Sequence, residues 1–346
     1  MSAGARILVA GIGGASLGSE IVKSLVLAGR WAVFGCDISP LATGHYRADV
    51  EETFLVDPDR YVSGVLDVCR RASIVCVVPG AEAPAKILGQ AAAAFEAAGI
   101  RVATNAPEVV QTCTDKAALF ARLATLGVPT PRTTAVTHPE RFDEVGYPCV
   151  VKPATASGGS AFVFLADTRA EAALYLRYLL DQGHAPVAQE YLPVDEGEFT
   201  VGVLSLRDGR SVGSVALRRL LHAKLSVAAR TRSGVLSSGY SQGLIDEFPD
   251  VRAQAERIAA ALESAGPLNV QGRVRAGTLV PFEVNARFSA STYLRALAGF
   301  NEVDLYLGAL LHGETPAARA LRPGHYLRDL TEIYVEDRAL KCRGTP

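Results

Sequence analysis

Short apolar runs alternate with helical stretches over the first hundred residues. Buried strands are predicted at Arg6–Ala10, Trp31–Ile38, Ser73–Pro79 and Arg101–Thr104, and helices at Gly18–Gly29, Tyr61–Ala72 and Ala81–Ala98. Strands that alternate with crossover helices pair in parallel, because helices must cover both faces of their sheet. Residues 1–112 are therefore predicted to form a small, doubly wound α/β domain.

The pattern changes after Thr114. A helix is predicted at Asp115–Leu126, with Thr114 as its N-cap. Two paired strands follow, Tyr147–Lys152 and Ala161–Ala166, joined by a loop of small residues. A helix at Thr168–Asp181 and a strand at Val187–Tyr191 complete this unit, so residues 113–192 are predicted to form a small lobe.

The third region has the pattern of antiparallel hairpins. One is predicted at Phe199–Leu206 and Ser211–Leu217, around Asp208-Gly209, and a second at Leu268–Val274 and Thr278–Val284. A helix at Val251–Ala265 lies between them. Residues 193–320 are therefore predicted to form a larger lobe on an antiparallel sheet, with 321–346 as a C-terminal extension.

Composition narrows the class of protein. The formal net charge is −1, from 35 basic and 36 acidic residues, which gives no electrostatic reason to expect nucleic acid as a partner. No apolar run approaches the ~18 residues of a membrane span, and the first residues lack the pattern of a secretory signal. We expect a cytoplasmic protein without a membrane partner, whose six cysteines are free, buried thiols.

A glycine-rich turn follows the first strand. Gly11, Gly13 and Gly18 depart from the dinucleotide spacing G-x-G-x-x-G, and Asp37 ends the second strand. NAD(P) binding by an oxidoreductase is therefore an alternative hypothesis. The simpler interpretation is that these glycines permit a tight turn between strand and helix.

Phosphate chemistry is indicated at the first pair of strands in the small lobe. Lys152 ends a strand and is followed by a loop containing Ser157, Gly158, Gly159 and Ser160. An ammonium group and several backbone N–H groups can surround a phosphate chain. The loop is no Walker A motif, because Gly-Lys-Ser/Thr occurs nowhere in the chain. An ordinary hairpin with an exposed lysine is the alternative.

The second hairpin of the larger lobe carries candidate metal ligands. Glu283 and Asn285 are two residues apart on one strand and so share a face, and Gln271 across the hairpin can join them. Hard oxygen ligands of this kind suit Mg²⁺ bound to phosphate oxygens. An exposed polar strand face is the alternative.

Taken in order, these motifs resemble those of the ATP-grasp superfamily. They are Asp115-Lys116, Val150–Ser160, Gln189–Leu192, Glu198–Val201, Gly266–Gln271 and Phe282–Ser289. The likeness is to single-unit relatives of the carbamoyl-phosphate synthetase large subunit. It implies a pre-ATP-grasp, Rossmann-like domain followed by a two-lobed ATP-grasp fold, α/β and α+β in class.

The resemblance also implies roles for individual residues. Lys116 and Lys152 would contact ATP phosphates, and Ser157–Ser160 would close over them. Gln189, Glu190, Tyr191 and Leu192 would line the adenine pocket, with Glu190 and Glu198 close to the base or ribose. Gln271, Glu283 and Asn285 would hold one or two Mg²⁺ ions. Arg287 would face the transferring phosphoryl group, and Arg230 is the candidate for binding a substrate carboxylate.

Two departures from the family pattern occur. Gln271 stands where many members have an acidic residue, and Ala286 replaces the usual proline. The expected function is that of a carboxylate–amine ligase, which converts a small carboxylate such as an amino acid into an acyl phosphate. A phosphotransferase, a carboxylase or a catalytically silent nucleotide-binding protein remain alternatives. The expected partners are small carboxylates and amines, and a homodimer is the default assembly.

Overall fold

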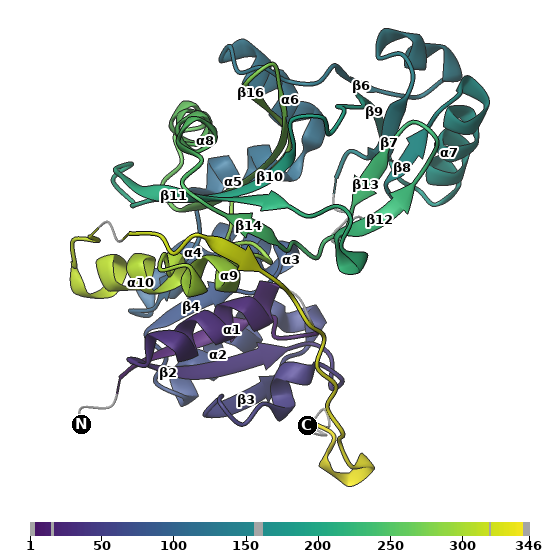
Figure 1. Ribbon diagram of the computed structural model, residues 1–346. Coiled ribbons are helices and arrows are strands. Elements are labelled where there is room, and N and C mark those ends of the chain that lie inside the picture. Colours follow the sequence, from purple (N-terminus) through teal and green to yellow (C-terminus); the bar gives the residue numbers. More distant parts are fainter. Residues whose placement is uncertain (1–3, 15–16, 156–161, 318–319, 342–346) are drawn as a thin grey trace.

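The computed structural model describes residues 4–14, 17–155, 162–317 and 320–341, drawn as coloured ribbons in Figure 1. In this part of the chain the N-terminal region forms a parallel sheet with the order β3-β2-β1-β4-β5. Helices cover both of its faces, so its strands are nearly continuous apolar runs, as predicted. The elements are β1 (Ala5–Ala10), α1 (Leu17–Ala28), β2 (Trp31–Asp37), β3 (Glu52–Leu55), α2 (Tyr61–Arg71), β4 (Cys76–Pro79), α3 (Glu82–Gln90), α4 (Ala92–Ala97) and β5 (Arg101–Val102).

Two details of this domain differ from the sequence prediction. The stretch Ala81–Ala98 is not one helix, because α3 ends at Gln90 and α4 begins at Ala92. Gly89 is buried just before this break, a position where glycine weakens a helix. The strand β3 was not predicted, since its Glu-Thr-Phe-Leu sequence has neither an apolar run nor an extended alternation.

The small lobe is a four-stranded sheet with the order β6-β9-β7-β8, covered by helix α7. Its core includes Val151, Phe142 and Leu176. Thr168 is the N-cap of α7 and forms a capping box. Its hydroxyl accepts a hydrogen bond from the Glu171 backbone N–H, and the Glu171 carboxylate accepts one from the Thr168 backbone N–H. The elements are β6 (Thr133–Ala135), β7 (Cys149–Pro153), β8 (Phe164–Ala166), α7 (Arg169–Asp181) and β9 (Pro186–Glu190).

The larger lobe is an antiparallel sheet with the order β16-β15-β10-β11-β14-β17. Both predicted hairpins are confirmed, and their turns place Gly209 and Gly277 at positive φ. A two-stranded ribbon, β12-β13, extends toward the small lobe (Figure 1). The elements are β10 (Glu198–Ser205), β11 (Ser211–Arg219), β12 (Val227–Arg230), β13 (Val235–Ser237), β14 (Gly243–Ile245), α8 (Pro249–Ala261), β15 (Pro267–Arg275), β16 (Thr278–Asn285), α9 (Thr292–Leu297), α10 (Glu302–His312) and β17 (Gly324–Tyr326).

Helices α5 (Pro107–Thr114) and α6 (Lys116–Thr125) share a core with the larger sheet and with α8. The N-cap of α6 is Asp115, whose carboxylate accepts from the backbone N–H groups of Ala117 (2.9 Å) and Ala118 (3.0 Å). Thr114, the predicted cap, instead donates its hydroxyl to the Gln111 carbonyl and ends α5. Asp115 is favoured over Thr114 as the N-cap because its carboxylate accepts from two unpaired N–H groups of the first helical turn at once.

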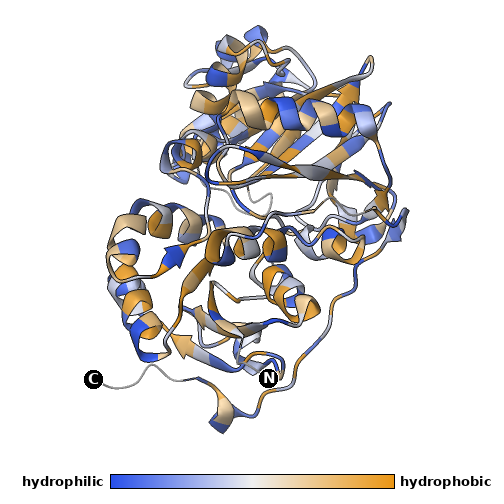
Figure 2. Cartoon of the chain, turned by 90° about the vertical axis from the view of Figure 1, so that its left-hand side faces the viewer, coloured by the Kyte–Doolittle hydropathy of each residue, from blue (hydrophilic) through white to orange (hydrophobic). Residues whose placement is uncertain are grey.

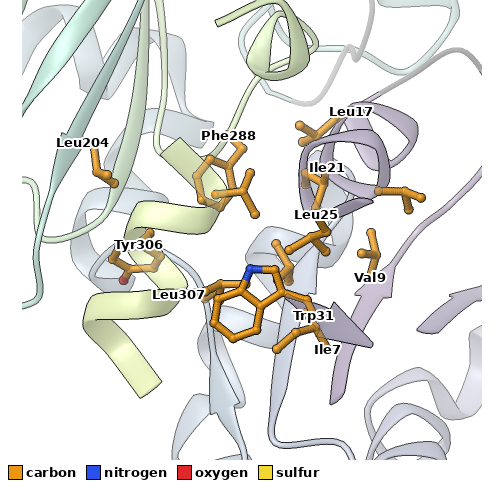
Figure 3. Packing of buried hydrophobic residues seen from close by; sticks show 14 of the residues in the cluster. Ile7, Val9, Leu17, Ile21, Leu25, Trp31, Leu204, Phe288, Tyr306 and Leu307 are labelled. Carbon is orange, nitrogen blue, oxygen red and sulfur yellow. The ribbon is translucent and has the colours of Figure 1, made fainter. Parts of the chain in front are cut away.

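The N-terminal domain and the larger lobe are joined by one apolar core. Figure 3 shows Leu17, Ile21 and Leu25 of α1 facing Phe288 and Leu307 of the C-terminal half. Burying this surface fixes the two parts against each other, since each buried large apolar side chain contributes roughly 1.5–3 kcal/mol.

Two composition-based expectations can be compared with the structure. The cysteines within the described residues, Cys36, Cys69, Cys76, Cys113 and Cys149, are free and buried, as predicted. Across the same part of the chain, each helix is too short or too polar to traverse a lipid bilayer.

Candidate active site

A cleft of about 530 Å³ lies where the small lobe, the larger lobe and the N-terminal domain meet. Its lining contains residues from all three parts, most of them ends of strands or loops that follow strands. Tyr191 and Leu192 of the small lobe line one end. Leu17 and Glu82 of the N-terminal domain also line the cleft. Candidate residues that line it are Lys116, Lys152, Gln189, Glu190, Tyr191, Leu192, Gln271, Glu283 and Arg287.

Lys152 lies at the end of β7 and is almost completely buried. Its ammonium donates to Gln189 Oε1 (2.8 Å) and to the Phe282 carbonyl (3.2 Å). Burial, together with the nearby positive charge of Lys116, lowers the pKa of Lys152 to about 7, although Glu283 acts in the opposite direction. A buried ammonium with neutral acceptors only is poised to receive an anionic ligand.

Lys116 is brought to the same wall by backbone contacts. Its N–H donates to the Ala154 carbonyl (2.9 Å), and Asp115 forms an isolated bridge with Thr155. The cleft therefore receives two cations at the point where the glycine-rich loop begins. The predicted phosphate-loop residues Ser157, Gly158, Gly159 and Ser160 lie outside the described residues.

The walls beside Lys152 are apolar and form a slot suited to a flat aromatic base. They comprise Val150, Val163, Tyr191, Leu192, Leu236 and Phe282. The Tyr191 hydroxyl accepts from the Val235 N–H (2.9 Å), which fixes the ring against the β12-β13 ribbon. Gly234 is required there, because a Cβ at this position would lie 2.2 Å from the tyrosine oxygen.

Glu190 lines the cleft but is already engaged. Its carboxylate accepts from the Arg132 backbone (3.1 Å) and forms ion pairs with Arg132 (3.3 Å) and Arg275 (3.0 Å). Burial acts to raise the pKa of Glu190, but the hydrogen bonds from Arg132 and Arg275 lower it overall.

Glu198 does not line the cleft, contrary to its predicted place near the base or ribose. It lies directly across the β10–β15 pair from Arg273, whose Nε donates to it at 2.9 Å, and Arg219 lies 3.5 Å away. All three side chains are buried. The carboxylate is therefore used to balance two guanidinium groups, because unpaired buried charge is very costly.

Arg273 is the member of this triad that reaches the cleft. It also donates to the carbonyls of Leu192 and Val235 and lies 4.9 Å from the centre of the Tyr191 ring. The sequence prediction missed it, although its place two residues after Gln271 on the same strand was a usable signal.

The candidate metal ligands are only partly brought together. Gln271 and Glu283 are paired across β15 and β16, and Gln271 Nε2 donates to Glu283 Oε2 (3.1 Å). Asn285 is buried and lines a small pocket that adjoins the cleft, and its Nδ2 has no partner within the described residues. The described residues contain no cluster of three or more histidine, cysteine or acidic side chains.

This donor set fits Mg²⁺ of the kind that phosphates hold. The hydrogen bond orients the Gln271 amide so that its Oε1 remains available beside the Glu283 carboxylate. Mg²⁺ is usually bound by one or two protein oxygens, with phosphate oxygens and water as the other ligands. Glu283 and Gln271 would therefore suffice as the protein's contribution to such a site, while the buried Asn285 is the least accessible candidate.

Arg287 and Glu82 face each other across the boundary between the larger lobe and the N-terminal domain. Arg287 Nη2 lies 3.9 Å from Glu82 Oε2, and both side chains are partly exposed to the cleft. Arg287 Nη1 donates to the Phe288 carbonyl (2.9 Å), whereas its buried Nε has no partner among the described residues. The guanidinium is therefore held in place and still has N–H donors that could bind a ligand.

Glu82 was missed by the sequence prediction, although a signal existed. It follows β4, beside β1, at the point where the order of the parallel sheet reverses. Ligands of doubly wound domains bind at this crevice. The segment Ser289–Ser291, which also lines the cleft, was likewise not predicted.

Arg230, the predicted carboxylate ligand, lies away from the cleft. Its side chain at the end of β12 is exposed and donates to the Leu221 carbonyl. The neighbouring segment Ser237–Ser241 lines the cleft in its place. Arg230 is misplaced because the β12-β13 ribbon carries it outward, which the spacing in the sequence did not reveal.

The glycine-rich turn of the first strand is explained by packing. A Cβ at Gly18 would lie 1.8 Å from the Gly11 carbonyl oxygen, and one at Gly80 would lie 2.1 Å from it. The Asp37 carboxylate accepts from the backbone N–H groups of Ile12 (2.9 Å) and Ser39 (3.0 Å). Both carboxylate oxygens of Asp37, which would bind the ribose of a dinucleotide, are thus already hydrogen-bonded within the domain.

Comparison with known proteins decides the family. Residues 113–291 match the model of the ATP-grasp domain, and residues 7–103 match that of the PylC-like N-terminal domain. The chain belongs to the ATP-grasp family. The predicted fold class, a Rossmann-like domain followed by a two-lobed ATP-grasp fold, is thereby confirmed.

The individual relatives of this ATP-grasp protein have low sequence identity to it. It is 28% identical over 225 residues to a carbamoyl phosphate synthase large chain of Thermus thermophilus, covering 61% of this chain and 20% of the relative. The chain thus spans about a fifth of the length of that relative.

Two solved structures share the fold. The L-amino acid ligase from Bacillus licheniformis is 17% identical, with a TM-score of 0.64 over 89% of this chain and 74% of the other. The biotin carboxylase–beta-gamma-ATP complex from Campylobacter jejuni is 14% identical, with a TM-score of 0.68 over 92% of this chain and 74% of the other.

Proposed function

We propose that this ATP-grasp protein is an ATP-dependent carboxylate–amine ligase that activates an amino acid as its acyl phosphate. The observation that carries the proposal is the composition of the cleft. Two lysines and a carboxylate–amide pair lie on one set of walls, and an arginine with an opposing glutamate lies at the boundary with the N-terminal domain. The first set suits a magnesium–triphosphate, and the second suits a substrate that carries both charges.

The nucleotide would occupy the apolar slot beside Lys152. Its base would stack between Tyr191 and the aliphatic walls, and its phosphates would extend toward Lys116 and Lys152. Glu283 and Gln271 would hold Mg²⁺, which neutralises phosphate charge when it is bound. Positioning and charge neutralisation are the main work in phosphoryl transfer, and these residue types perform it.

The second substrate would bind between Glu82 and Arg287. Their opposite charges, 3.9 Å apart, match the ammonium and carboxylate groups of an amino acid, each of which would replace part of their mutual ion pair. Arg287 then holds the carboxylate beside the phosphate end of the cleft. Glu82 selects for the ammonium group.

The reaction balances in two steps. A substrate carboxylate oxygen attacks the γ-phosphorus, the bond to the β-phosphate oxygen breaks, and ADP leaves. The nitrogen of a neutral amine then attacks the acyl carbon, the bond to the phosphate oxygen breaks, and an amide, phosphate and one proton are released. Exclusion of water protects the acyl phosphate between the steps, which is the benefit of a cleft enclosed by three parts of the chain.

The test is a screen of amino acids, paired with amines, for ADP release, with mass spectrometry of the products. Carboxylate labelled with ¹⁸O should transfer one labelled oxygen to the released phosphate. ADP release that requires bicarbonate, or a hydroxyl acceptor in place of the amine, would instead support a carboxylase or a phosphotransferase. Phosphate without label would reject the acyl-phosphate step.

A further inference from the structure

The C-terminal strap, residues 324–341, connects the two parts of the molecule that enclose the substrate end of the cleft. It begins as β17, which pairs with β14 in the larger sheet. It ends at Lys341, whose backbone N–H donates to the Tyr46 hydroxyl (3.1 Å) and whose ammonium donates to the Thr53 carbonyl (3.1 Å) in the N-terminal domain. Figure 1 and Figure 2 show it running along the outside of that domain, mostly as extended chain, with one 3-10 turn at Asp337–Ala339.

Most side chains of the strap are open to solvent, but Arg328 is not. The exposed fraction of its side chain is 5%, against 86% for Arg338 further along the same segment. A guanidinium is withdrawn from water only at a large cost, which must be offset by partners of good geometry. The burial of Arg328 in an otherwise exposed segment therefore indicates a specific role for this side chain.

Its partners come from three separate segments. Glu20 of α1, whose side chain is 1% exposed, accepts two bonds from the guanidinium, at 2.9 and 3.1 Å. The carbonyls of Ser241 (3.3 Å) and Ala290 accept two more. The Arg328 backbone N–H donates to Gln242 Oε1 at 3.2 Å. The paired, planar geometry with Glu20 is one that arginine provides and lysine does not.

All three segments reach the cleft. Ser241 and Ala290 line it directly, and so does Leu17, one helical turn before Glu20 on α1. Ala290 also lies within the Ser289–Ser291 segment, shortly after Arg287. Arg328 thus bonds, from outside the cleft, to the segment that follows Arg287 and to two further wall segments, on α1 and at Ser241. It lies beyond both segments matched by the family models, which end at residues 103 and 291.

We propose that Arg328, through its ion pair with Glu20, is a positioning residue for the substrate end of the cleft. It fixes the distance between the N-terminal domain and the Ser241 and Ala290 walls, and it leaves the nucleotide end unaffected. The identity of that end as an amino acid site rests on the proposed function. The mechanical part, a strap that fixes three walls, does not.

Hydrogen exchange tests the mechanical part without any substrate. Arg328→Gln and Glu20→Gln should each accelerate amide exchange at residues 17–22, 241–244 and 289–293, while exchange in strands β7 and β9 stays unchanged. The matched control is Arg338→Gln, which alters an exposed arginine of the same strap. Variants that exchange like the control would overturn the proposal, and so would acceleration spread evenly over the whole molecule.

Kinetics test the consequence for the site. Each variant should raise the KM for the amino acid about tenfold or more, with the dissociation constant for ATP changed less than about twofold, because loss of a charge-assisted pair acts on the walls it holds. The double variant should change KM by less than the product of the two single effects, since both substitutions break the same Arg328–Glu20 ion pair, although Glu20 also pairs with Lys23 at 2.9 Å. Arg328→Lys, which keeps the charge but not the paired geometry, should fall between. If the KM values for both substrates rise together, the residue stabilises the fold and does not position the site.

The two hypotheses fail separately. If the unaltered protein releases no ADP with any carboxylate and amine, the proposed function fails, and hydrogen exchange still decides the role of the strap. If the unaltered protein is active and Arg328→Gln matches Arg338→Gln, the strap proposal fails alone.

Discussion

The two ends of the cleft are built in opposite ways. At the base side of the nucleotide end, Lys152 and Gln189 lie on the neighbouring strands β7 and β9 of one small sheet, and Tyr191 directly follows β9. At its metal side, Gln271 and Glu283 are paired across the single hairpin β15-β16 of the larger lobe. At the substrate end, Glu82, Arg287 and Arg328 come from the N-terminal domain, the larger lobe and the strap. Within each lobe, the side chains of the first end are placed by the pairing of neighbouring strands, whereas those of the second end are placed by how whole parts of the chain pack together.

This difference affects how each end responds to changes in the sequence. Local pairing keeps a phosphate-binding arrangement intact even when the surrounding chain varies. An end assembled from distant parts can change its substrate through any of several segments. We therefore expect damage at the nucleotide end to abolish all turnover, and damage at the substrate end to alter affinity for one substrate.

The largest effect is expected at the metal side of the nucleotide end. Glu283→Ala should lower kcat by roughly 10³-fold, because it removes the carboxylate that neutralises charge beside the phosphates. The check is steady-state ADP release over a range of Mg²⁺ concentrations. Glu247→Ala, which removes an exposed carboxylate on the same lobe, is the matched control. Turnover within threefold of the control would remove Glu283 from the site.

A smaller and selective effect is expected at the substrate end. Glu82→Gln should lower kcat/KM for the amino acid by about 10- to 100-fold, since a charge-assisted hydrogen bond contributes roughly 1.5–3 kcal/mol. The dissociation constant for ATP, measured by titration calorimetry, should stay the same. A substrate analogue without the amino group should lose nothing in the variant. An equal loss for both compounds would show that Glu82 does not recognise the ammonium group.

The residues of the nucleotide end were easier to predict from the sequence than those of the substrate end. Lys152, Gln271 and Glu283 were predictable, because each lies at a strand end or on a hairpin whose register follows from its turn. Arg328 was not, because no local pattern tells which distant segment will face Glu20. Glu82 carried only a general signal, its place after β4 where the order of the parallel sheet reverses, and that place does not reveal that Arg287 will face it. Glu198 was misplaced for a third reason: its fate depends on the register that sets Arg273 directly opposite, and that register is fixed by the packing of the sheet.

A pH experiment sharpens the description of the nucleotide end. Burial lowers the pKa of Lys152 to about 7, so in the free protein this ammonium loses its proton as the pH rises above neutrality. Bound phosphate favours the charged form and raises that pKa. Binding of ATP should therefore take up a proton above pH 7 and weaken as pH rises, by up to about tenfold per unit.

Calorimetry in buffers of different ionisation enthalpy measures this uptake directly. At pH 8 the unaltered protein should take up close to one proton per ATP bound. Lys152→Arg stays charged and should take up almost none. Equal proton uptake by both proteins would assign the ionisation to another group.

The smallest effect is expected at Arg230, and it tests whether the boundary of the cleft is drawn correctly. The side chain is exposed on the β12-β13 ribbon and donates to the Leu221 carbonyl. Arg230→Gln should change stability by less than about 0.5 kcal/mol, as for most surface substitutions, and should leave kcat/KM for the amino acid within twofold. Thermal unfolding and steady-state kinetics check both values. A tenfold rise in KM would mean that the ribbon moves onto the cleft when ligands bind, since only such a movement brings this guanidinium to a substrate. The substrate end would then also include the β12-β13 ribbon of the larger lobe, and the separation between the two ends would hold only for the free protein.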